Sequence, residues 1–354
     1  MAKNKPAGKT PGIVGKKSAL SCVSVSKKIV VVTGGGGRLG SVVVPLLAKK
    51  YFLRLLVIER NGPQKRFAKL IKDGCVDLVQ CDLSDGRASN MLLLARACRG
   101  AFAVLNMAGL TDPSASKQAL YNANVLPTKN ILEAARREKV EKIVHISSTG
   151  VYGAPAKLPC DESCDFAPIY AYGESKLQGE QLVAQSDFKK VILRPTVLYG
   201  AATANQFESL AKMLLSGKAV LVGDGTNRLP FVHERDVAQA IELALRKDVV
   251  GDFILCGDDE LMQSRAWELV AKELGVAPPS KKVSLLQAKL AGLFSSFKAR
   301  LLSRKPSFSL ELLDVIAADR AFSNSKAKKI LGWKPKEMLA NALGEMARQW
   351  RLQN

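Results

Sequence analysis

The sequence predicts an α/β fold in which a doubly wound parallel sheet is followed by a smaller C-terminal α+β domain. Two observations lead to this prediction: short β-branched runs alternate with helical segments from Lys28 onward, and a run of glycines follows the first of these strands. Such alternation is typical of a parallel sheet, because parallel strands need long crossover connections. The composition agrees, since 354 residues that are 47% hydrophobic and 24% charged can bury a sizeable core.

The elements are expected in a regular order along the chain. Strands are predicted at residues 29–32, 53–58, 78–80, 103–106, 142–146 and 191–193, with helices at 40–49, 65–72 and 128–138 between them. Beyond Pro195 the alternation loosens, and later helices at 263–274 and 339–350 indicate the second domain.

Two segments carry much of the formal net charge of +21. Residues 1–28 contain seven Lys and no acidic residue, and we expect a disordered basic tail rather than an Arg-rich transit peptide. Residues 281–305 combine seven cations with leucines at helical spacing. A basic amphipathic helix there could contact a membrane surface, but a lid or core-facing helix is the preferred interpretation because Gly292 interrupts it. No nucleic-acid-binding signature accompanies the charge, so specific nucleic-acid binding is not expected.

Cysteine, histidine and hydropathy patterns exclude several classes of protein. The seven Cys form no C-x-x-C pair and the two His are far apart, which argues against a zinc site or a disulfide scaffold. No apolar run approaches the roughly 18 residues of a membrane span, and no secretory signal is evident. We therefore expect a cytoplasmic protein with reduced cysteines and no metal.

The first predicted strand runs directly into Thr33-Gly34-Gly35-Gly36-Gly37-Arg38-Leu39-Gly40. Gly34, Gly37 and Gly40 would allow a tight turn, close approach of the backbone to phosphate and packing of the next helix, whose N-terminus supplies N–H donors. This context predicts a dinucleotide site. Glu59, at the end of the second strand, would accept hydrogen bonds from the adenosine ribose. Arg60 could instead pair with a 2′-phosphate, so NAD is the favoured cofactor and NADP the alternative.

A second group of residues has the chemistry of an alcohol dehydrogenase. Tyr172 and Lys176 lie four residues apart on an expected helix, and therefore on one helical face, while Ser148 follows the strand that ends at Ile146. An ammonium near a phenol lowers the pKa of the phenol toward a value suited to proton abstraction. Tyr172 would then be the acid/base, Ser148 would bind the reacting oxygen, and Lys176 would also hold the nicotinamide ribose.

Together these motifs resemble the extended short-chain dehydrogenase/reductase family, also called the NAD-dependent epimerase/dehydratase family. The resemblance runs from Lys28 to nearly the C-terminus. Besides the motifs above, it rests on Asp82-Leu83, Asn106-Met107-Ala108-Gly109, Asn124-Val125, Leu193-Arg194-Pro195, Gly223-Asp224-Gly225, Phe231-Val232-His233 with Asp236, and Leu331-Gly332-Trp333-Lys334-Pro335.

The resemblance implies a Rossmann-type domain and frequent homodimers. It implies that Asp82 and Leu83 line the adenine, that Ala108 and Gly109 flank the cofactor phosphates, and that Asn124 supports the active-site backbone. It also implies that the cofactor is bound by Arg38, Leu39, Met107 and Pro195. Residues 29–196, completed by about 228–256, would bind the cofactor, and residues 197–227 and 257–354 the substrate.

Other polar residues of these motifs have a structural interpretation. For Asp236, capping of a helix over 237–245 is at least as good an interpretation as a catalytic role. His145 and His233 are expected to pack beside the sheet, and Trp333 to fill a core.

Departures from the family's pattern bear on the substrate. Sugar-nucleotide dehydratases of the family carry an Asp-Glu pair where this chain has Thr149 and Gly150, so dehydration is not expected. Where this chain has Val197 and Leu229, the family's epimerases usually have Asn and Arg. The side chain of Arg228, next to Leu229, would point to the other side of an extended segment. An apolar wall cannot satisfy a sugar nucleotide, which favours a less polar substrate.

Three hypotheses follow. The first is an NAD(P)-dependent dehydrogenase or reductase of a bulky, fairly apolar alcohol or ketone, similar to the 3β-hydroxysteroid dehydrogenase and dihydroflavonol-reductase-like branch. The second is a nucleotide-sugar 4-epimerase that uses the same Ser148, Tyr172 and Lys176. The third is an inactive dinucleotide-binding scaffold subunit, against which the intact catalytic residues argue.

Overall fold

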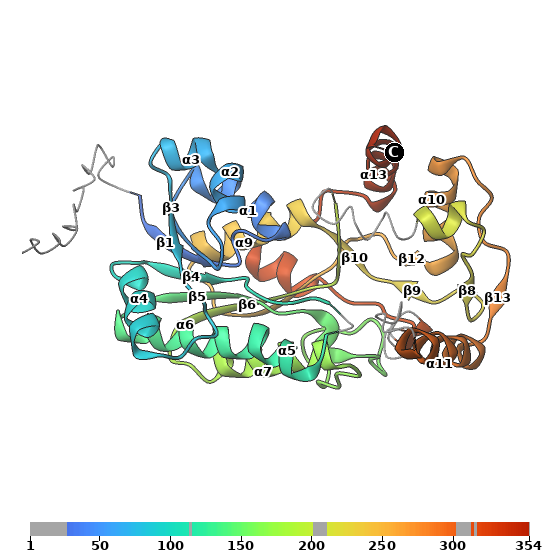
Figure 1. The fold of residues 1–354 in the computed structure, drawn as a ribbon, viewed down its shortest axis with the longest axis horizontal. Helices are drawn as coiled ribbons and strands as arrows, with labels where there is room; N and C mark the ends of the chain where they lie inside the picture. The colour runs from blue at the N-terminus through green and yellow to red at the C-terminus, as the bar shows by residue number, and fades with distance from the viewer. Residues whose placement is uncertain (1–26, 113–114, 201–210, 302–312, 315–316, 354) are drawn as a thin grey trace, which may run out of the picture.

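Figure 1 shows the computed structural model of the chain, which describes residues 27–112, 115–200, 211–301, 313–314 and 317–353. The predicted basic tail lies outside the described residues except for Lys27 and Lys28. The end of the second basic stretch, residues 302–305, lies outside them as well.

A seven-stranded parallel sheet is the centre of the described structure. Its strands are β1 (Ile29–Thr33), β2 (Phe52–Val57), β3 (Val76–Gln80), β4 (Ala103–Asn106), β5 (Lys142–Ile146), β6 (Lys189–Pro195) and β11 (Gly251–Leu255). They are ordered β11-β6-β5-β4-β1-β2-β3, so the chain reverses direction across the sheet between β1 and β4. In open α/β sheets, ligands bind outside the carboxyl ends of the strands at such a switch point. The predicted doubly wound fold is confirmed.

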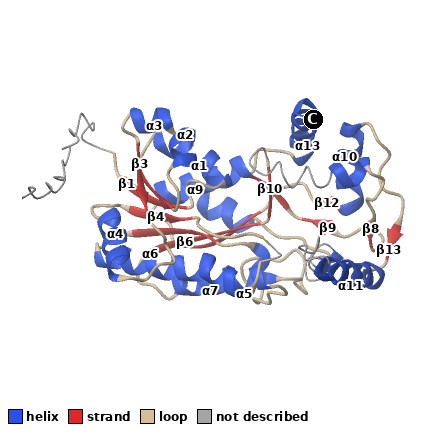
Figure 2. Cartoon of the chain, viewed as in Figure 1, coloured by secondary structure: helices blue, strands red, loops and turns tan. Residues whose placement is uncertain are grey.

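Helices cover both faces of this sheet (Figures 1 and 2). One face carries α1 (Arg38–Ala48), α2 (Asn61–Arg66), α3 (Ala68–Lys72) and α9 (Glu234–Arg246), and the other carries α4 (Ala88–Cys98), α5 (Lys117–Leu120), α6 (Leu126–Arg137) and α7 (Ala171–Ala184). Successive side chains of a strand point to opposite faces of the sheet. Because helices cover both faces, the strands carry apolar side chains on both sides. Val30 and Val32 pack with the first layer, whereas Val31 packs with the second.

Beyond the sheet, short strands pair in twos and support a separate apolar cluster. The pairs are β7 (Val197–Tyr199) with β10 (Phe231–His233), β9 (Arg228–Leu229) with β12 (Leu261–Met262), and β8 (Leu221–Val222) with β13 (Lys282–Val283). Nearby, α10 (Gln263–Leu274) packs on α13 (Leu339–Gln353) around Tyr199, Leu274 and Leu343. Figure 1 places α10, β8 and β13 at the end of the molecule opposite β3.

Three local predictions need correction. The single helix expected at 65–72 is divided, because Phe67 leaves the helical conformation (φ −109°, ψ 20°) and buries its side chain in the core between α2 and α3. Ile58, expected in the second strand, lies beyond β2 and is 75% exposed. The expected interruption at Gly292 is also wrong, since α11 (Leu285–Leu301) continues through it. One glycine costs a helix only about 1 kcal/mol relative to alanine.

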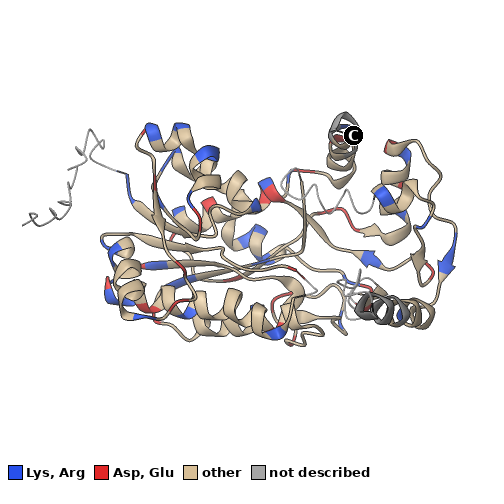
Figure 3. Cartoon of the chain, in the orientation of Figure 1, with Lys and Arg blue, Asp and Glu red and all other residues tan. Residues whose placement is uncertain are grey.

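The apolar face of α11 is open to solvent over the part whose side chains the structure describes. Leu286, Leu290 and Leu293 recur at helical spacing, and each is at least 51% exposed. The expectation of a core-facing helix is therefore wrong for these leucines. None of the helices in the described ranges is long and apolar enough to cross a membrane. Basic residues are spread over both helical layers and the far end of the molecule (Figure 3).

Candidate active site

The glycine turn after β1 brings the N-terminus of α1 to the carboxyl edge of the sheet. Gly34 adopts φ +68°, and a Cβ there would lie 2.7 Å from the Ala108 nitrogen. Gly40 lies against the turn itself, where a Cβ would collide with the carbonyl of Gly35. Exposed Gly37 stands at the start of α1, which has neither a capping side chain nor an acidic residue in its first turn. The first backbone N–H groups of α1 therefore have no capping side chain. Together with the positive end of the helix dipole, they suit the binding of a phosphate group.

Thr33 ties this turn to the end of β4. Its hydroxyl donates to Asn106 Oδ1 at 2.7 Å and accepts from the backbone nitrogens of Met107 and Ala108 at 3.1 and 3.0 Å. The segment carrying Met107, Ala108 and Gly109 is thereby fixed against Gly34. The sequence pattern included Thr33 in the glycine motif but did not predict that it fixes the segment after β4.

The residues predicted to bind adenosine lie at the ends of β2 and β3. Glu59 is exposed just after β2, but Arg60 donates to the carbonyl of Leu78 at 3.1 Å and so serves the backbone. Asp82 accepts from the nitrogen and hydroxyl of Ser84 at 2.9 and 2.7 Å, whereas Leu83 is buried in the core. Asp82 therefore closes a local turn at this edge.

Arg66 was missed by the sequence analysis. Its guanidinium donates to the carbonyls of Gly36 and Gly37 at 2.8 and 3.2 Å, so a cation stands beside the glycine turn. The distance in sequence between Arg66 and the turn left no pattern that could have revealed the contact.

Ser148, Tyr172 and Lys176 are brought together at the end of β5. The Ser148 side chain accepts from the Gly150 nitrogen at 3.0 Å, and it is close enough to Tyr172 to affect the pKa of the phenol. Lys176, one turn further along α7, donates to the carbonyl of Ile146 at 2.5 Å. The predicted catalytic residues therefore lie at one corner, where Lys176 is buried and Ser148 and Tyr172 are half-buried.

The pKa values at this corner differ from the expectation. Burial raises the pKa of Tyr172, neighbouring Tyr170 raises it further, and the hydrogen bond from Ser148 lowers it only in part. Burial lowers the pKa of Lys176 to about 8, although Glu180 opposes the change. The predicted lowering of the Tyr172 pKa by Lys176 is wrong for this geometry, because the Lys176 ammonium is directed at a strand carbonyl.

Asn124 connects α7 to the loop after β4. It lies in a π-helical turn at Tyr121–Val125, a feature that often marks functional sites. Its side chain accepts from the Leu110 nitrogen at 2.7 Å and donates to the Ser175 hydroxyl at 2.8 Å, and Ser175 in turn donates to the carbonyl of Tyr172. This is the backbone support that the resemblance implied for Asn124; Ser175 was missed.

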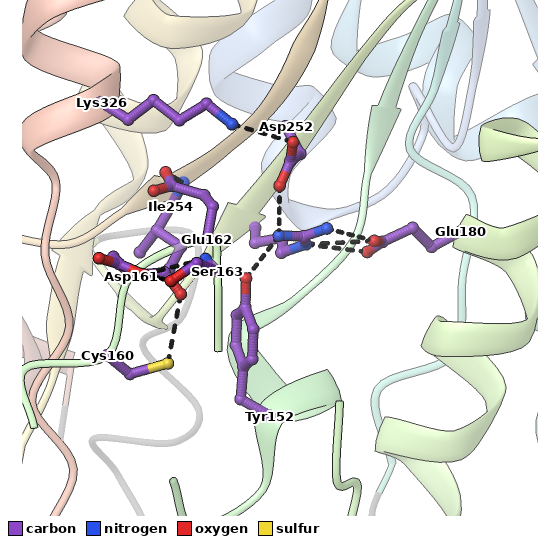
Figure 4. A network of polar contacts seen from close by, with 10 residues as sticks. Tyr152, Cys160, Asp161, Glu162, Ser163, Glu180, Asp252, Ile254 and Lys326 are labelled. Atoms are coloured by element: carbon purple, nitrogen blue, oxygen red, sulfur yellow. Dashed lines mark hydrogen bonds and ion pairs between the residues drawn. The ribbon is translucent and has the colours of Figure 1, made fainter. Parts of the chain in front are cut away.

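A buried ionic network lies behind α7 (Figure 4). Arg194 on β6 pairs with Glu180 on α7 at 2.6 Å and with Asp252 on β11 at 2.7 Å, and it donates to the hydroxyl of Tyr152. Lys326 adds a further contact to Asp252 at 3.0 Å. The network joins α7 to β6 and β11 and has a structural role.

Of the four residues predicted to bind substrate, two are engaged elsewhere. Thr149 is buried and donates to the carbonyl of Pro195 at 3.4 Å. Arg228 pairs with Asp319 at 2.9 Å and with Glu260 at 3.3 Å. Val197 is 39% exposed, and Leu229 pairs with Leu261 of β12.

The remaining polar candidates have structural roles. His145 is buried on β5 with its Nδ1 atom 3.1 Å from the Asn106 amide, and His233 accepts from the Arg235 nitrogen at the start of α9. The suggested capping of that helix by Asp236 is wrong. Its carboxylate instead accepts hydrogen bonds from the backbone nitrogens of Lys336 and Glu337 at 3.0 and 3.1 Å. Trp333 is fully buried, as predicted, and donates to the carbonyl of Asp236. No group of three or more His, Cys, Asp or Glu in the described part of the chain could hold a metal ion.

The glycine turn and the Ser148, Tyr172 and Lys176 corner lie at one edge of a Rossmann-type sheet, which is the arrangement of the short-chain dehydrogenases/reductases. The model of one family within this class, the NAD dependent epimerase/dehydratase family, matches residues 30–257. The chain belongs to that family, and its cofactor is NAD.

Relatives within the family differ in what they act on. The 3beta-hydroxysteroid-dehydrogenase/decarboxylase isoform 1 of Arabidopsis thaliana is 26% identical over 75% of this chain and 64% of that protein. An N-acetyl-alpha-D-glucosaminyl-diphospho-ditrans,octacis-undecaprenol 4-epimerase of Escherichia coli O157:H7 is 30% identical over 42% of this chain and 46% of that protein. The chain thus spans about half to two thirds of the length of these relatives.

The solved structure of a UDP-glucuronic acid 4-epimerase from Bacillus cereus in complex with NAD superimposes with a TM-score of 0.70. The match covers 91% of this chain and 99% of that chain at 20% identity. At this identity the likeness establishes the fold.

Proposed function

We propose that the protein is an NAD(P)-dependent dehydrogenase or reductase that acts on one alcohol or ketone centre of a bulky, fairly apolar small molecule. Residues 29–196, completed by 228–256, would bind the cofactor, and residues 197–227 and 257–354 would bind the substrate. The Arabidopsis relative, named as a hydroxysteroid dehydrogenase, supports a substrate of this kind.

The observation that carries the proposal is the engagement of Arg228. Recognition of a sugar diphosphate needs cations that are free to bind phosphate. Arg228 is held by two carboxylates, those of Asp319 and Glu260, while its neighbour Leu229 and the half-exposed Val197 are apolar. This set of residues suits an apolar substrate better than a nucleotide sugar.

The cofactor site is proposed from residues that meet at the β1 and β4 switch point. Gly34, Gly37 and Gly40, with Arg38 and Leu39 at the start of α1, would hold the pyrophosphate. Glu59 and Asp82 would contact the adenosine, with Arg60 and Leu83 beside them. Met107, Ala108, Gly109, Asn124 and Pro195 would border the cofactor on the nicotinamide side.

The reaction would proceed at Tyr172. NAD, when bound, supplies the hydride chemistry. In the reductive direction, the phenol of Tyr172 would donate its proton to the ketone oxygen as the carbonyl carbon gains the hydride. Ser148, which lies beside the same hydroxyl, would orient that oxygen, and Lys176 would hold the nicotinamide ribose. In the oxidative direction the same atoms exchange in reverse.

Quantifying the nicotinamide released from freshly purified, denatured protein would test the proposal. A dehydrogenase must exchange its cofactor, so we expect substoichiometric nucleotide and reversible binding of added NAD. The alternative is a nucleotide-sugar 4-epimerase like the relative from E. coli, which regenerates its cofactor in each cycle. Near-stoichiometric bound NAD would favour that alternative, and failure to bind any nicotinamide nucleotide would overturn both.

The assembly and location of the protein are also proposed. We expect a cytoplasmic homodimer, for which size-exclusion chromatography with light scattering is the direct measurement. Specific nucleic-acid binding is not part of the proposal. Membrane contact through residues 281–305 is not favoured either, and flotation with anionic vesicles would reveal it.

A further inference from the structure

Three polar side chains form a row across neighbouring strands of the sheet, on the face that carries α6 and α7. Thr33 of β1 is in register with Asn106 of β4, and Asn106 is in register with His145 of β5. All three are buried, and only 2% of the surface of His145 is exposed. The Thr33 hydroxyl lies 2.7 Å from Asn106 Oδ1, and the Asn106 amide nitrogen lies 3.1 Å from His145 Nδ1. The row therefore begins at the glycine turn and ends on β5.

Hydrogen bonds at both ends of the Asn106 amide determine its orientation. The Thr33 hydroxyl accepts from two backbone nitrogens and so donates its own hydrogen to Asn106, which presents its oxygen there. The Thr128 hydroxyl donates its hydrogen to the carbonyl of Asn124 at 2.9 Å, so Asn106 presents its amide NH2 group to Thr128 at 3.1 Å. The same NH2 group faces His145 Nδ1, which therefore accepts. In a neutral imidazole the proton then lies on Nε2.

The Nε2 atom of His145 is left without an acceptor. It is fully buried and forms no hydrogen bond with the part of the chain that the structure describes. Burial lowers the pKa of His145 well below 6.5, so the ring is neutral near pH 7 and Nε2 is an N–H donor. Because an unpaired buried donor is costly, it is expected where a functional state of the protein completes it.

Lys176 is the functional side chain that interacts with His145. It is buried and donates to the carbonyl of Ile146, the residue that follows His145 on β5. Lys176 and His145 are close enough for the charge of the ammonium to lower the pKa of the imidazole. An ammonium has no lone pair and cannot accept from Nε2, whereas a neutral amine can. The state of Lys176 that satisfies both side chains is therefore the neutral one.

Charged and titratable side chains also come from the elements packed against α7. Besides the exposed ones of α6 and those at the opposite ends of β5 and β6, the groups on α7 and its neighbours are Lys117, Tyr121, His145, Tyr152, Tyr170, Tyr172, Glu174, Glu180 and Arg194. Glu174 pairs with Lys117 at 3.0 Å. Glu180 favours the ammonium of Lys176, but it is already paired with Arg194 at 2.6 Å. The ammonium thus depends on a carboxylate that has another partner.

We infer that His145 is a positioning residue for Lys176: the row from Thr33 holds the His145 Nε2–H group so that it donates to the neutral amine and opposes the ammonium. When Lys176 releases its proton to water, its nitrogen gains the lone pair that accepts from Nε2, and it still donates to the carbonyl of Ile146. The inference rests on the proposed function, in which Lys176 takes part, but its test reads the charge of Lys176 directly and needs no substrate.

The first test uses the wild-type full-length protein with histidine enriched in ¹⁵N. The chain has two His, so the ring of His145 is distinguished from that of His233 by a single substitution. Long-range ¹H–¹⁵N NMR spectra should show the His145 proton on Nε2, and the Nε2 resonance should move with pH around the pKa of Lys176, which is about 8. It should stay constant in Lys176→Met. A proton on Nδ1, or a wild-type Nε2 resonance that does not follow the titration of Lys176, would overturn the inference.

The second test measures the pKa of Lys176 in variants, from the resonance of its Cε atom in protein with lysine enriched in ¹³C. His145→Asn places an amide oxygen near the position of Nδ1, where it accepts from Asn106, and removes the Nε2 donor. The pKa of Lys176 should rise, with about a tenfold lower acid dissociation constant, the effect of losing one hydrogen bond. His233→Asn is the control: it replaces the residue that accepts from the Arg235 nitrogen at the start of α9 and should leave the pKa of Lys176 unchanged.

An unchanged or lowered pKa of Lys176 in His145→Asn would contradict the inference, and so would a rise of the same size in His233→Asn. The tautomer is read in the wild-type protein, so the first test decides even where a variant fails to fold. A protein that meets both expectations but turns over no alcohol or ketone would contradict only the proposed function. A dehydrogenase or reductase whose Lys176 titrates alike with and without His145 would contradict only the role of His145.

Discussion

Replacement of Lys176 by methionine should stabilise the protein at neutral pH while removing its activity. The Lys176 ammonium is buried, and burial lowers its pKa from 10.5 to about 8. A lysine whose folded pKa lies below its unfolded pKa destabilises the folded state when it is charged. This destabilisation is complete below pH 8 and is relieved as the pH rises from 8 toward 10.5.

The magnitude follows from those two pKa values. Linkage gives a penalty of about 3 kcal/mol at pH 7, which falls to about 1 kcal/mol at pH 10. Lys176→Met also loses the hydrogen bond to the carbonyl of Ile146, which costs about 1 to 3 kcal/mol. That loss is the same at both pH values, because a neutral amine still donates. The difference in unfolding free energy between the variant and the wild type should therefore shrink by about 2 kcal/mol between pH 7 and pH 10.

Urea denaturation of both proteins at the two pH values measures this change. Lys69→Met provides the control, since Lys69 is exposed on α3 and its ammonium meets water in both states. The same difference between Lys176→Met and wild type at pH 7 and pH 10 would refute the reasoning. It would mean that the buried ammonium is compensated in the folded protein by contacts other than the one to Ile146.

Three further predictions concern the site and its support. Tyr172→Phe should lower turnover by at least about a hundredfold with NAD affinity nearly unchanged, because only proton transfer is lost; retained activity in a steady-state assay would identify another acid/base. Glu59→Ala should shift the ratio of NAD to NADP affinity toward NADP, and an unchanged NAD affinity by calorimetry would remove Glu59 from the ribose site. Glu180→Gln should lower the unfolding free energy by about 3 to 5 kcal/mol, because it leaves Arg194 buried with one partner fewer; a urea midpoint like that of the wild type would contradict this.

The sheet was predictable because its signals are local. Each strand is a short apolar run, and the turn after β1 needs glycine where φ is positive and where β4 comes close. Errors arose where tertiary contacts overrule a local pattern. Phe67 interrupts a helical pattern because its side chain enters the core, and Ile58 ends outside β2 despite its β-branched side chain.

The candidate site was predictable as a set of residues but not as an electrostatic arrangement. The spacing of Tyr172 and Lys176 places them on one face of α7, yet spacing does not reveal that Lys176 is directed at the carbonyl of Ile146. The pairing of Arg228 with Asp319 likewise joins residues far apart in the sequence. Which residues pair in this way depends on how the second part of the chain packs against the sheet. Short sequence motifs do not predict that packing.

The buried cations fall into two groups, which differ in how well the protein compensates their charge. Arg194 is surrounded by acceptors from α7, β11 and the segment after β5, so its burial holds elements together. Lys176 meets one neutral carbonyl, and the Nε atom of Arg320 meets none. A fold optimised for stability alone would pair these two charges or replace them with apolar side chains. That Lys176 remains buried and weakly compensated beside the proposed acid/base is expected if its contacts are completed only when the cofactor binds.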